Sequence, residues 1–505
     1  MIRVDTQNIR KQQYNFWNNI HFHPTDGIED DWGREYLDAV AAHHAADTVR
    51  MYTMFEDIVT MDQAGNLRYD FSENDVRMDY MVSKGFNLLV CYNFIPPCIA
   101  VENDRSNTEK TTATRYKGKT LCTMPPRDYS LWEEVCYAYT AHIVERYGLE
   151  RVKNWYLHCY NEPDIAGFFL SPLGGTPEAK QKRCEEYCKL YAAFEAGTRR
   201  VSDELKIGGP TAALWPMFDY FLGWLEKHPC KVDFFCAHTY GTNPGAMKDG
   251  TKISVEHNYV KLKKYVDLME RHGFGGKELI IDEWCAASGG FCDLDISPGL
   301  IYREDETFAA FYTQLIARYI AENIPLSKTM ICLSGSHQPH QCPGRFPEFS
   351  GFRSFFTEHG IAKPIFNAYR MGAKLKSGIL GCETKAENFT ILPTTDGENL
   401  AVMMTYAAPE FDWGLPDLHE RLSFDLTGRY RVTTWRIDQT HTNPYSRWKR
   451  EGWADKPTAE QLAILREEGE MKPCEVREVT ADGELCLNVD MVCNGTMLIE
   501  LEKLS

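Results

Sequence analysis

The sequence lacks the apolar segments that direct proteins to or through a membrane. Its N-terminus has no apolar core of the length that a signal peptide needs, and no other run approaches the about 20 apolar residues of a membrane-spanning helix. The chain also has no internal repeat and no low-complexity segment. We therefore expect a cytoplasmic protein that does not associate with membranes.

Positively charged residues are fewer than negatively charged ones. The chain has 55 Lys and Arg against 72 Asp and Glu, which gives a net charge of −17 and a pI near 5.4. Such a balance argues against nucleic acid or an anionic membrane surface as a partner. A neutral substrate fits this composition better.

Paired Cys-x-x-Cys spacing, typical of structural zinc sites, is absent. The 17 cysteines are an odd number, and several stand inside apolar runs, as Cys91 and Cys236 do. This placement favours buried, reduced thiols over a disulfide framework. His21 and His23 alternate on an expected strand, but no third ligand stands at a useful spacing, so we predict no metal site.

The first three quarters of the chain alternate between short apolar runs and helical patterns. Alternation of this kind indicates a parallel sheet, and eight units favour a closed (β/α)8 TIM barrel over an open sheet. We expect this barrel to span 14–376. Its eight strands are predicted at 14–23, 47–55, 86–92, 154–162, 206–210, 232–240, 279–284 and 329–333.

After about residue 377 the pattern changes to short alternating segments separated by turn residues, as in an antiparallel β-sandwich. We predict a C-terminal sandwich over 377–505, interrupted by a polar insertion at 438–473. This insertion either shapes the pocket mouth or forms a subunit contact. Residues 1–13 form an N-terminal segment, for which a strand of the sandwich is one assignment.

Two glutamates stand at the ends of the fourth and seventh expected strands. Glu162 follows the run that begins at Asn154, and Glu283 follows Leu279–Asp282. In barrel enzymes the carboxyl ends of the strands build the active site. Two carboxyl groups in different protonation states can hydrolyse a glycosidic bond, although ion-pair networks also use such positions.

Other polar and aromatic residues stand near the glutamates in the sequence or in the expected barrel. Asn161 can donate its amide to a sugar hydroxyl, and His238 and Tyr240 point to one side of a strand, where they can hold Glu283 or the sugar. Arg50 either keeps Glu283 ionised or pairs with another barrel acid. Trp284 either stacks on a sugar or packs in the core.

The ordered set of these motifs resembles glycoside hydrolase family 39, which includes β-xylosidases. The motifs are Asn161-Glu162-Pro163-Asp164, Lys206-Ile207-Gly208-Gly209-Pro210, His238-Thr239-Tyr240 and Asp282-Glu283-Trp284, with further matches over nearly the whole chain. The resemblance implies a retaining mechanism without metal or other cofactor, Glu162 as acid/base and Glu283 as nucleophile. It also implies that Asn161, His238 and Tyr240 line the sugar subsite, and that the protein is a homo-oligomer.

The chain departs from the family's β-xylosidases at two loops. Where they carry Arg-x-His-Gly after strand two, this chain has Arg50-Met51-Tyr52-Thr53, and where they carry an acidic Phe-Glu-Glu stretch after strand eight, it has Ser334 to Gln341. We therefore count Arg50, Tyr52, Trp284 and His337 among the expected substrate-binding residues, while the sugar stays open.

The leading hypothesis is a retaining exo-glycosidase that cleaves short oligosaccharides or glycosides of the β-xyloside type. A second hypothesis keeps the mechanism and changes the sugar to an arabinoside or a galactoside. A third, from another class, is a carbohydrate-binding barrel without turnover.

Overall fold

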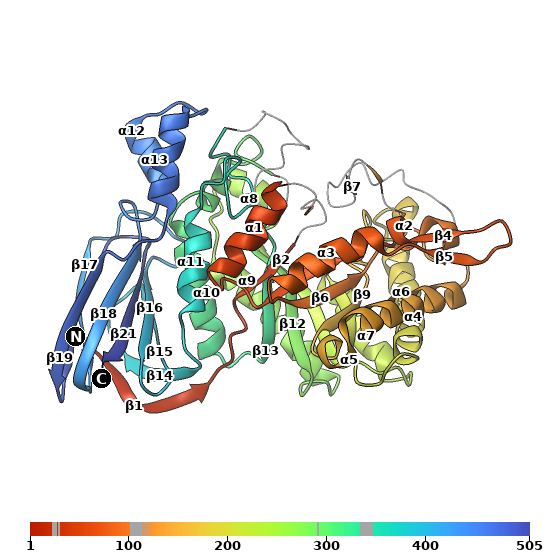
Figure 1. The fold of residues 1–505 in the computed structure, drawn as a ribbon, viewed down its shortest axis with the longest axis horizontal. Helices are drawn as coiled ribbons and strands as arrows, with labels where there is room; N and C mark the ends of the chain where they lie inside the picture. The colour runs from red at the N-terminus through yellow and green to blue at the C-terminus, as the bar shows by residue number, and fades with distance from the viewer. Residues whose placement is uncertain are drawn as a thin grey trace.

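The computed structural model describes residues 1–22, 28, 31–101, 115–116, 119–120, 122–289, 292–333 and 347–504. They form a barrel surrounded by helices, with a large sheet at one side of it (Figure 1). None of the helices in these ranges combines the length and the apolar character needed to cross a membrane. All cysteines in the described ranges are free thiols, and most are buried.

Eight strands close into one barrel, and every pair of neighbours in it is parallel. This confirms the predicted eight-fold barrel. The strands, in chain order, are β2 (Asn19–His21), β3 (Thr48–Tyr52), β6 (Asn87–Tyr92), β9 (Tyr156–Cys159), β10 (Lys206–Ala212), β11 (Phe234–Thr242), β12 (Glu278–Ala287) and β13 (Leu326–Ile331).

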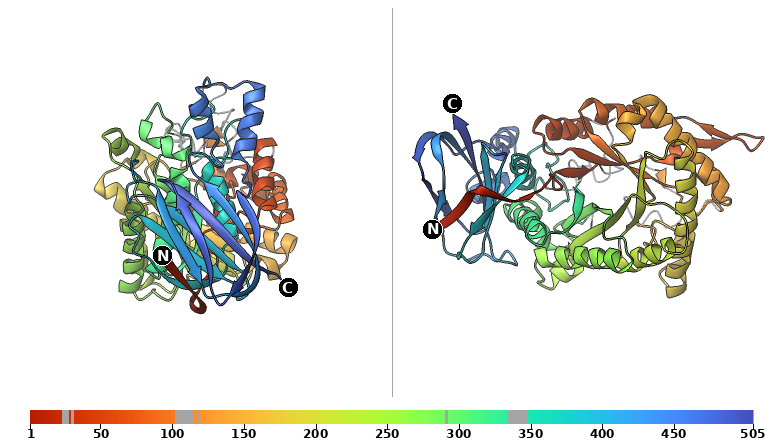
Figure 2. Two further views of the ribbon diagram at one scale, coloured as in Figure 1. Left: turned by 90° about the vertical axis from the view of Figure 1, so that its left-hand side faces the viewer. Right: turned by 90° about the horizontal axis from the view of Figure 1, so that it is seen from below.

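A helix follows each barrel strand and covers its outer side, as the view from below shows (Figure 2, right). These helices are α1 (Asp31–Ala42), α3 (Ser72–Ser83), α4 (Tyr129–Tyr147), α6 (Pro177–Arg199), α7 (Trp215–Leu225), α9 (Val255–Arg271), α10 (Thr307–Ala321) and α11 (Pro364–Ala373). Shorter elements lie in the connections: α2 (Phe55–Ile58), α5 (Leu149–Val152), α8 (Pro244–Lys248), η1 (Pro97–Ile99), η4 (Ser171–Leu173), η5 (Pro298–Arg303) and the hairpins β4 (Val59–Met61) with β5 (Leu67–Tyr69) and β7 (Arg115–Tyr116) with β8 (Lys119–Thr120).

The floor of the barrel interior is apolar. A buried cluster collects side chains from five strands, namely Leu89, Tyr156, Phe234, Cys236, Ile280 and Met330. Because side chains alternate between the two faces of a strand, the residues two positions further along each strand also point inward, one layer higher. That next layer is polar, and it carries the site.

The second unit is a nine-stranded, mostly antiparallel sheet folded into a sandwich around its own apolar core. Its strands are β1 (Ile2–Gln12), β14 (Gly378–Glu383), β15 (Phe389–Thr395), β16 (Leu400–Tyr406), β17 (Leu418–Phe424), β18 (Thr427–Ile437), β19 (Glu475–Asp482), β20 (Leu485–Met491) and β21 (Gly495–Leu504). Strand β1 pairs with both β14 and β17, so the N-terminal residues belong to this sheet. The sheet packs against α10 and α11 of the barrel (Figures 1 and 2).

Two helices, α12 (Pro444–Glu451) and α13 (Ala459–Gly469), interrupt the sheet between β18 and β19. Apolar side chains of both helices pack with Phe349 and Ile361, which lie after the last barrel strand. Backbone and side-chain hydrogen bonds strengthen this contact, including one of 3.0 Å from Glu348 N to Asp455 O and one of 2.9 Å from Arg466 Nη2 to His359 O. The insertion therefore packs against the segment 347–361 of the same chain and supports it.

Some strands differ in length from the prediction. Strand β2 covers only three residues of the expected 14–23, and just before it the side chains of Trp17 and Asn18 donate to backbone carbonyls of α11. Strand β12, by contrast, continues four residues beyond Glu283.

Candidate active site

Glu162 lies in a tight turn three residues after β9, not on the strand itself. The turn contains two residues with left-handed backbone conformation, Tyr160 (φ 65°) and Glu162 (φ 44°), which is uncommon for side chains other than glycine. Hydrogen bonds to neighbouring strands hold it, from Tyr160 N to Tyr92 O (3.1 Å) and from Glu162 N to Thr211 O (3.1 Å). The turn brings the Glu162 carboxylate against His238.

Glu283 is placed by an irregularity in β12. Ala237 pairs with Ile281 and the next residue of β11, His238, pairs with Glu283, so Asp282 is an extra residue in the ladder. Such a β-bulge lets two consecutive side chains leave the strict alternation of a strand. Both Asp282 and Glu283 are buried and contact Arg50 in the barrel interior.

Arg50 connects three polar groups of the site. Its Nη1 donates to Glu283 Oε1 at 2.6 Å, its Nη2 donates to Asn161 Oδ1 at 2.7 Å, and its Nε lies 3.1 Å from Asp282 Oδ2. Burial alone would raise the pKa of Glu283, but the positive charges of His238 and Arg50 hold that pKa well below its usual range. Glu283 is therefore ionised at neutral pH.

His238 lies between the two glutamates. Its Nδ1 is 2.7 Å from Glu162 Oε1 and 3.6 Å from Glu283 Oε2, and its Nε2 is 3.6 Å from Asp282 Oδ2. Burial opposes a charge on the ring, but the carboxylates of Glu283 and Asp282 raise the pKa of His238 to about 10. The ring is thus an imidazolium at neutral pH, and its Nδ1 donates to Glu162.

Two tyrosine hydroxyls complete the surroundings of the Glu283 carboxylate. Tyr52 donates to Oε1 at 3.3 Å, and Tyr240 donates to Oε2. Burial raises the pKa of both phenols, so both remain neutral donors. The carboxylate of Glu283 consequently accepts hydrogen bonds on both oxygens and is fixed in orientation.

A neutral histidine, His158, accepts a hydrogen bond from Arg50. Burial and the charge of Arg50 lower the pKa of His158 to about 3. Its Nε2 accepts from Arg50 Nε at 3.4 Å, while its Nδ1 lies 2.8 Å from Thr211 Oγ1 and therefore donates to that hydroxyl. The guanidinium of Arg50 is thus held by His158 as well as by the carboxylates of Asp282 and Glu283.

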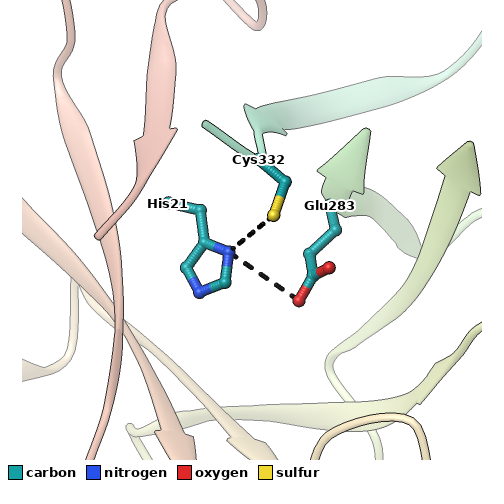
Figure 3. A group of neighbouring side chains, drawn as sticks. All are labelled: His21, Glu283 and Cys332. Carbon is teal, nitrogen blue, oxygen red and sulfur yellow. Dashed lines mark hydrogen bonds and ion pairs between the residues drawn. The ribbon is translucent and has the colours of Figure 1, made fainter. Parts of the chain in front are cut away.

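His21 and Cys332 approach Glu283 from β2 and from the end of β13 (Figure 3). His21 Nδ1 is 3.2 Å from Cys332 Sγ and 3.7 Å from Glu283 Oε1. These three residues have the spacing of metal ligands, as do two neighbouring groups of the site. However, the guanidinium of Arg50 lies against Glu283 and 3.3 Å from His21 Nε2, so a divalent ion there would face a buried positive charge. This set of donors fits a hydrogen-bonded carboxylate better than a cation.

Two of the sequence-predicted residues are not part of this cluster. Trp284 points to the opposite face of β12, because it directly follows Glu283. Its ring stacks on the rings of Phe311 and Tyr312 of α10, with 6.4 Å between the ring centres in each pair. The interpretation of Trp284 as a substrate-binding residue does not fit this position, whereas core packing does. His337 lies outside the described residues, as does the stretch Ser334–Gln341.

Sequence reasoning missed Asp282 and Arg353. Asp282 directly precedes Glu283, so alternation counted from an inward-facing Glu283 predicts that Asp282 faces outward. Asp282 instead follows the inward-facing Ile280 by two positions, and the bulge turns Glu283 inward beside it. Arg353 follows the eighth strand by more than 20 residues, and its Cζ lies 5.5 Å from the centre of the Tyr240 ring. No periodicity or motif in the sequence indicates that contact.

The geometry defines an eight-stranded parallel barrel with two neighbouring carboxyl groups in its polar layer. A model of glycosyl hydrolases family 39 matches residues 1–486. The chain belongs to this family and is a glycoside hydrolase, with a carbohydrate as its substrate.

The relatives that match this chain include proteins named β-xylosidase and proteins named α-L-iduronidase. A β-xylosidase of Caldicellulosiruptor saccharolyticus is 24% identical over 464 residues, covering 89% of this chain and 87% of that protein. An α-L-iduronidase of Canis lupus familiaris is 21% identical over an alignment of 576 positions, covering 99% of this chain and 78% of that protein. The crystal structure of a monomeric β-xylosidase from Caulobacter crescentus CB15 superposes with a TM-score of 0.81 at 21% identity, covering 100% and 99% of the two chains, and so shares the fold.

Proposed function

We propose that the protein is a retaining exo-glycosidase with Glu162 as acid/base and Glu283 as nucleophile. One observation carries the proposal: an oxygen of each carboxyl group and a ring nitrogen of His238 all lie within 4.8 Å of one another. Retaining enzymes hold the two carboxyl groups about 5 to 5.5 Å apart, whereas inverting enzymes need about 6.5 to 9.5 Å to admit a water molecule.

In the first step Glu283 attacks the anomeric carbon, and the bond from this carbon to the leaving oxygen breaks. Its depressed pKa keeps Glu283 ionised for this attack. Glu162 gives its proton to the leaving oxygen. Because Glu162 Oε1 accepts from His238, the other oxygen, Oε2, is the one that carries the transferable proton.

In the second step water displaces the sugar from Glu283. Esterification removes the negative charge of Glu283. Glu162 then takes a proton from the attacking water, and the bond between Glu283 and the sugar breaks. The anomeric configuration is retained because the carbon is inverted twice.

Asn161 is placed to bind a hydroxyl of the reacting sugar. Only the amide oxygen can accept from Arg50 Nη2, so this contact of 2.7 Å assigns Oδ1 and leaves Nδ2 to donate elsewhere. A hydrogen bond to the hydroxyl beside the anomeric carbon strengthens as positive charge develops in the transition state.

For the sugar we propose a pyranoside of the β-xyloside type. The support is the β-xylosidase name of relatives that align with almost the whole chain. An arabinoside or a galactoside would keep the same two steps. A carbohydrate-binding barrel without turnover is opposed by the pairing of an ionised Glu283 with a second carboxyl group in reach of it.

A covalent trap tests the proposal. An activated 2-fluoro-β-xyloside should add the mass of one sugar to the peptide that contains Glu283, and a panel of nitrophenyl glycosides should be hydrolysed with retention, as NMR of the first-formed product reports. Glu283→Ala should abolish both signals. Glu278→Ala is the matched control, because Glu278 lies at the other end of the same strand and pairs with Lys206. Hydrolysis by folded Glu283→Ala at the wild-type rate would refute the assignment.

The oligomeric state stays a prediction. The family resemblance implies a homo-oligomer, whereas the Caulobacter crescentus relative is described as monomeric. Sedimentation equilibrium of the purified protein would decide between a mass of 58.0 kDa and a multiple of it.

A further inference from the structure

Trp413 lies half exposed on the loop between β16 and β17, with an exposed fraction of 51%. Two cavities meet at this residue. One, of about 180 Å³, extends toward α8 and η5, and the other, of about 580 Å³, extends toward α12. Because both cavities are lined by Ile301, Asp305 and Trp413, they are two lobes of one groove, which we name the Trp413 groove.

The Trp413 groove lies where three parts of the chain meet. The barrel contributes η5 and the residues just before α10, the sandwich contributes the loop that carries Trp413, and the insertion contributes residues 439–440 and α12. Within the described part of the chain, none of the residues that line the groove forms a hydrogen bond with the carboxyl group of Glu162 or Glu283. The groove is therefore separate from the candidate active site.

Glu306 borders the larger lobe and has one carboxyl oxygen without a partner. The residue is buried, with only 1% of it exposed. Its Oε2 accepts from Asn443 Nδ2 at 2.6 Å, whereas its Oε1 has no hydrogen-bond partner among the described residues. Burial and the neighbouring Asp305 raise the pKa of Glu306 to about 8, so its carboxyl group is mostly protonated at neutral pH. A buried polar atom without a partner is unfavourable, and a ligand hydroxyl in this lobe can supply the missing partner.

The charged residues that line the groove are of both signs. Lys449 and Arg450 border the larger lobe, Lys252 and Glu410 border the smaller one, and Asp305 borders both. Three positive side chains thus stand against two carboxylates, because the buried glutamate of the larger lobe is mostly neutral. Neither a polyanion nor a metal ion is favoured by such a mixture. A neutral molecule with many hydroxyl groups fits it, since a hydroxyl can donate to a carboxylate and accept from Lys or Arg.

We propose that the Trp413 groove is a second carbohydrate-binding site, which binds an oligosaccharide chain outside the active site. A pyranose ring packs its apolar C–H face on the indole of Trp413, and its hydroxyls bond to the polar groups of both lobes. Such a site keeps a long substrate on the enzyme between turnovers, whereas a small aryl glycoside gains nothing from it. This inference goes beyond the proposed function and does not depend on the roles of Glu162 and Glu283.

Electrophoresis of the full chain in native gels that contain arabinoxylan, mixed-linkage β-glucan or galactan tests the proposal. At least one of these polysaccharides should retard the wild type, and Trp413→Ala should raise the dissociation constant for it by about 3- to 10-fold, as expected for a lost stacking contact. Trp413→Phe should recover part of the loss. Trp215→Ala is the matched control, because Trp215 is a half-exposed tryptophan (49%) on α7 that lines neither lobe. On a nitrophenyl glycoside, kcat/KM of Trp413→Ala should stay within about twofold of the wild type.

The gels decide between the outcomes. Retardation that Trp413→Ala weakens and Trp215→Ala keeps supports the inference, and the gel in which it occurs names the polysaccharide. No retardation of the wild type in any gel, equal retardation of the wild type and Trp413→Ala, or an equal loss in Trp215→Ala overturns the inference. Trp413 is half exposed, so we expect its variants to fold, and circular dichroism checks this. Failure of the proposed function is distinguishable, because it means that no nitrophenyl glycoside is hydrolysed, and the gels still decide the second site.

Discussion

The guanidinium of Arg50 binds Glu283 and Asp282 at the same time, with contacts of 2.6 and 3.1 Å, and both carboxylates and the guanidinium are buried. Sequence reasoning left two roles open for Arg50, to keep Glu283 ionised or to pair with another barrel acid. The geometry unites them, because one planar group reaches two consecutive acids across the bulge in β12.

Replacing Arg50 should therefore affect both stability and the pH profile. Arg50→Met leaves two buried carboxylates without their main partner and should lower the free energy of unfolding by about 3 to 5 kcal/mol. The pKa of Glu283 should rise, so the acid limb of kcat/KM should move to higher pH. Chemical denaturation and a pH–rate profile measure the two effects. Arg50→Lys should restore part of the charge effect without bridging both acids, and an unchanged acid limb would contradict the role given to Arg50.

Removing the carboxyl group of the proposed acid/base, Glu162, should lower kcat most for substrates with poor leaving groups. Glu162→Ala should lower kcat by about 10²- to 10⁴-fold on an alkyl glycoside, which needs protonation of its leaving oxygen. A dinitrophenyl glycoside needs little protonation, so its first step should lose far less. Sodium azide should restore turnover and give a glycosyl azide of retained configuration. An equal loss on both substrates, with no effect of azide, would argue against Glu162 as the acid/base.

His238 should make the stability of the protein fall as the pH rises. Its folded-state pKa is raised to about 10 from an ordinary value of 6.5. The stabilisation is complete below pH 6.5, and it is lost as the pH rises toward 10, because the folded protein holds a proton that the unfolded chain has released. The slope from this group is at most about 1.4 kcal/mol per pH unit.

Urea denaturation between pH 6 and 10 measures that slope. His238→Gln should flatten it. The surface variant His228→Gln, whose native ring hydrogen-bonds to the carbonyl of Trp224 and stacks on the Trp224 ring, should leave it as in the wild type. A slope that His238→Gln does not change would mean that another group causes the loss.

Trp284 should matter for stability and not for sugar binding. Its ring stacks between β12 and α10, away from the glutamates. Trp284→Phe should lower the free energy of unfolding by about 1 to 3 kcal/mol, since a smaller ring leaves part of the space empty. KM for the best aryl glycoside should stay within about twofold of the wild type. A tenfold rise in KM at unchanged stability would instead place Trp284 at the substrate.

The sequence by itself determined the architecture and the pair of acids. Apolar strands and amphipathic helices repeat along the first three quarters of the chain, and this local pattern indicates a (β/α)8 barrel before any contact is known. Parallel strands in a barrel place their carboxyl ends on one rim, so residues as distant as Glu162 and Glu283 are expected together. The motif order was specific enough to indicate the family that the comparison confirms.

Only the tertiary structure decided which neighbours of these acids face the site. A one-residue bulge turns Glu283 inward beside Asp282 and sends Trp284 outward, and alternation along an isolated strand cannot anticipate such a bulge. Arg353 and His21 meet the site from segments more than 300 residues apart. Contacts of this kind depend on how the closed barrel and the insertion behind it pack, which is a property of the whole chain and of no local stretch.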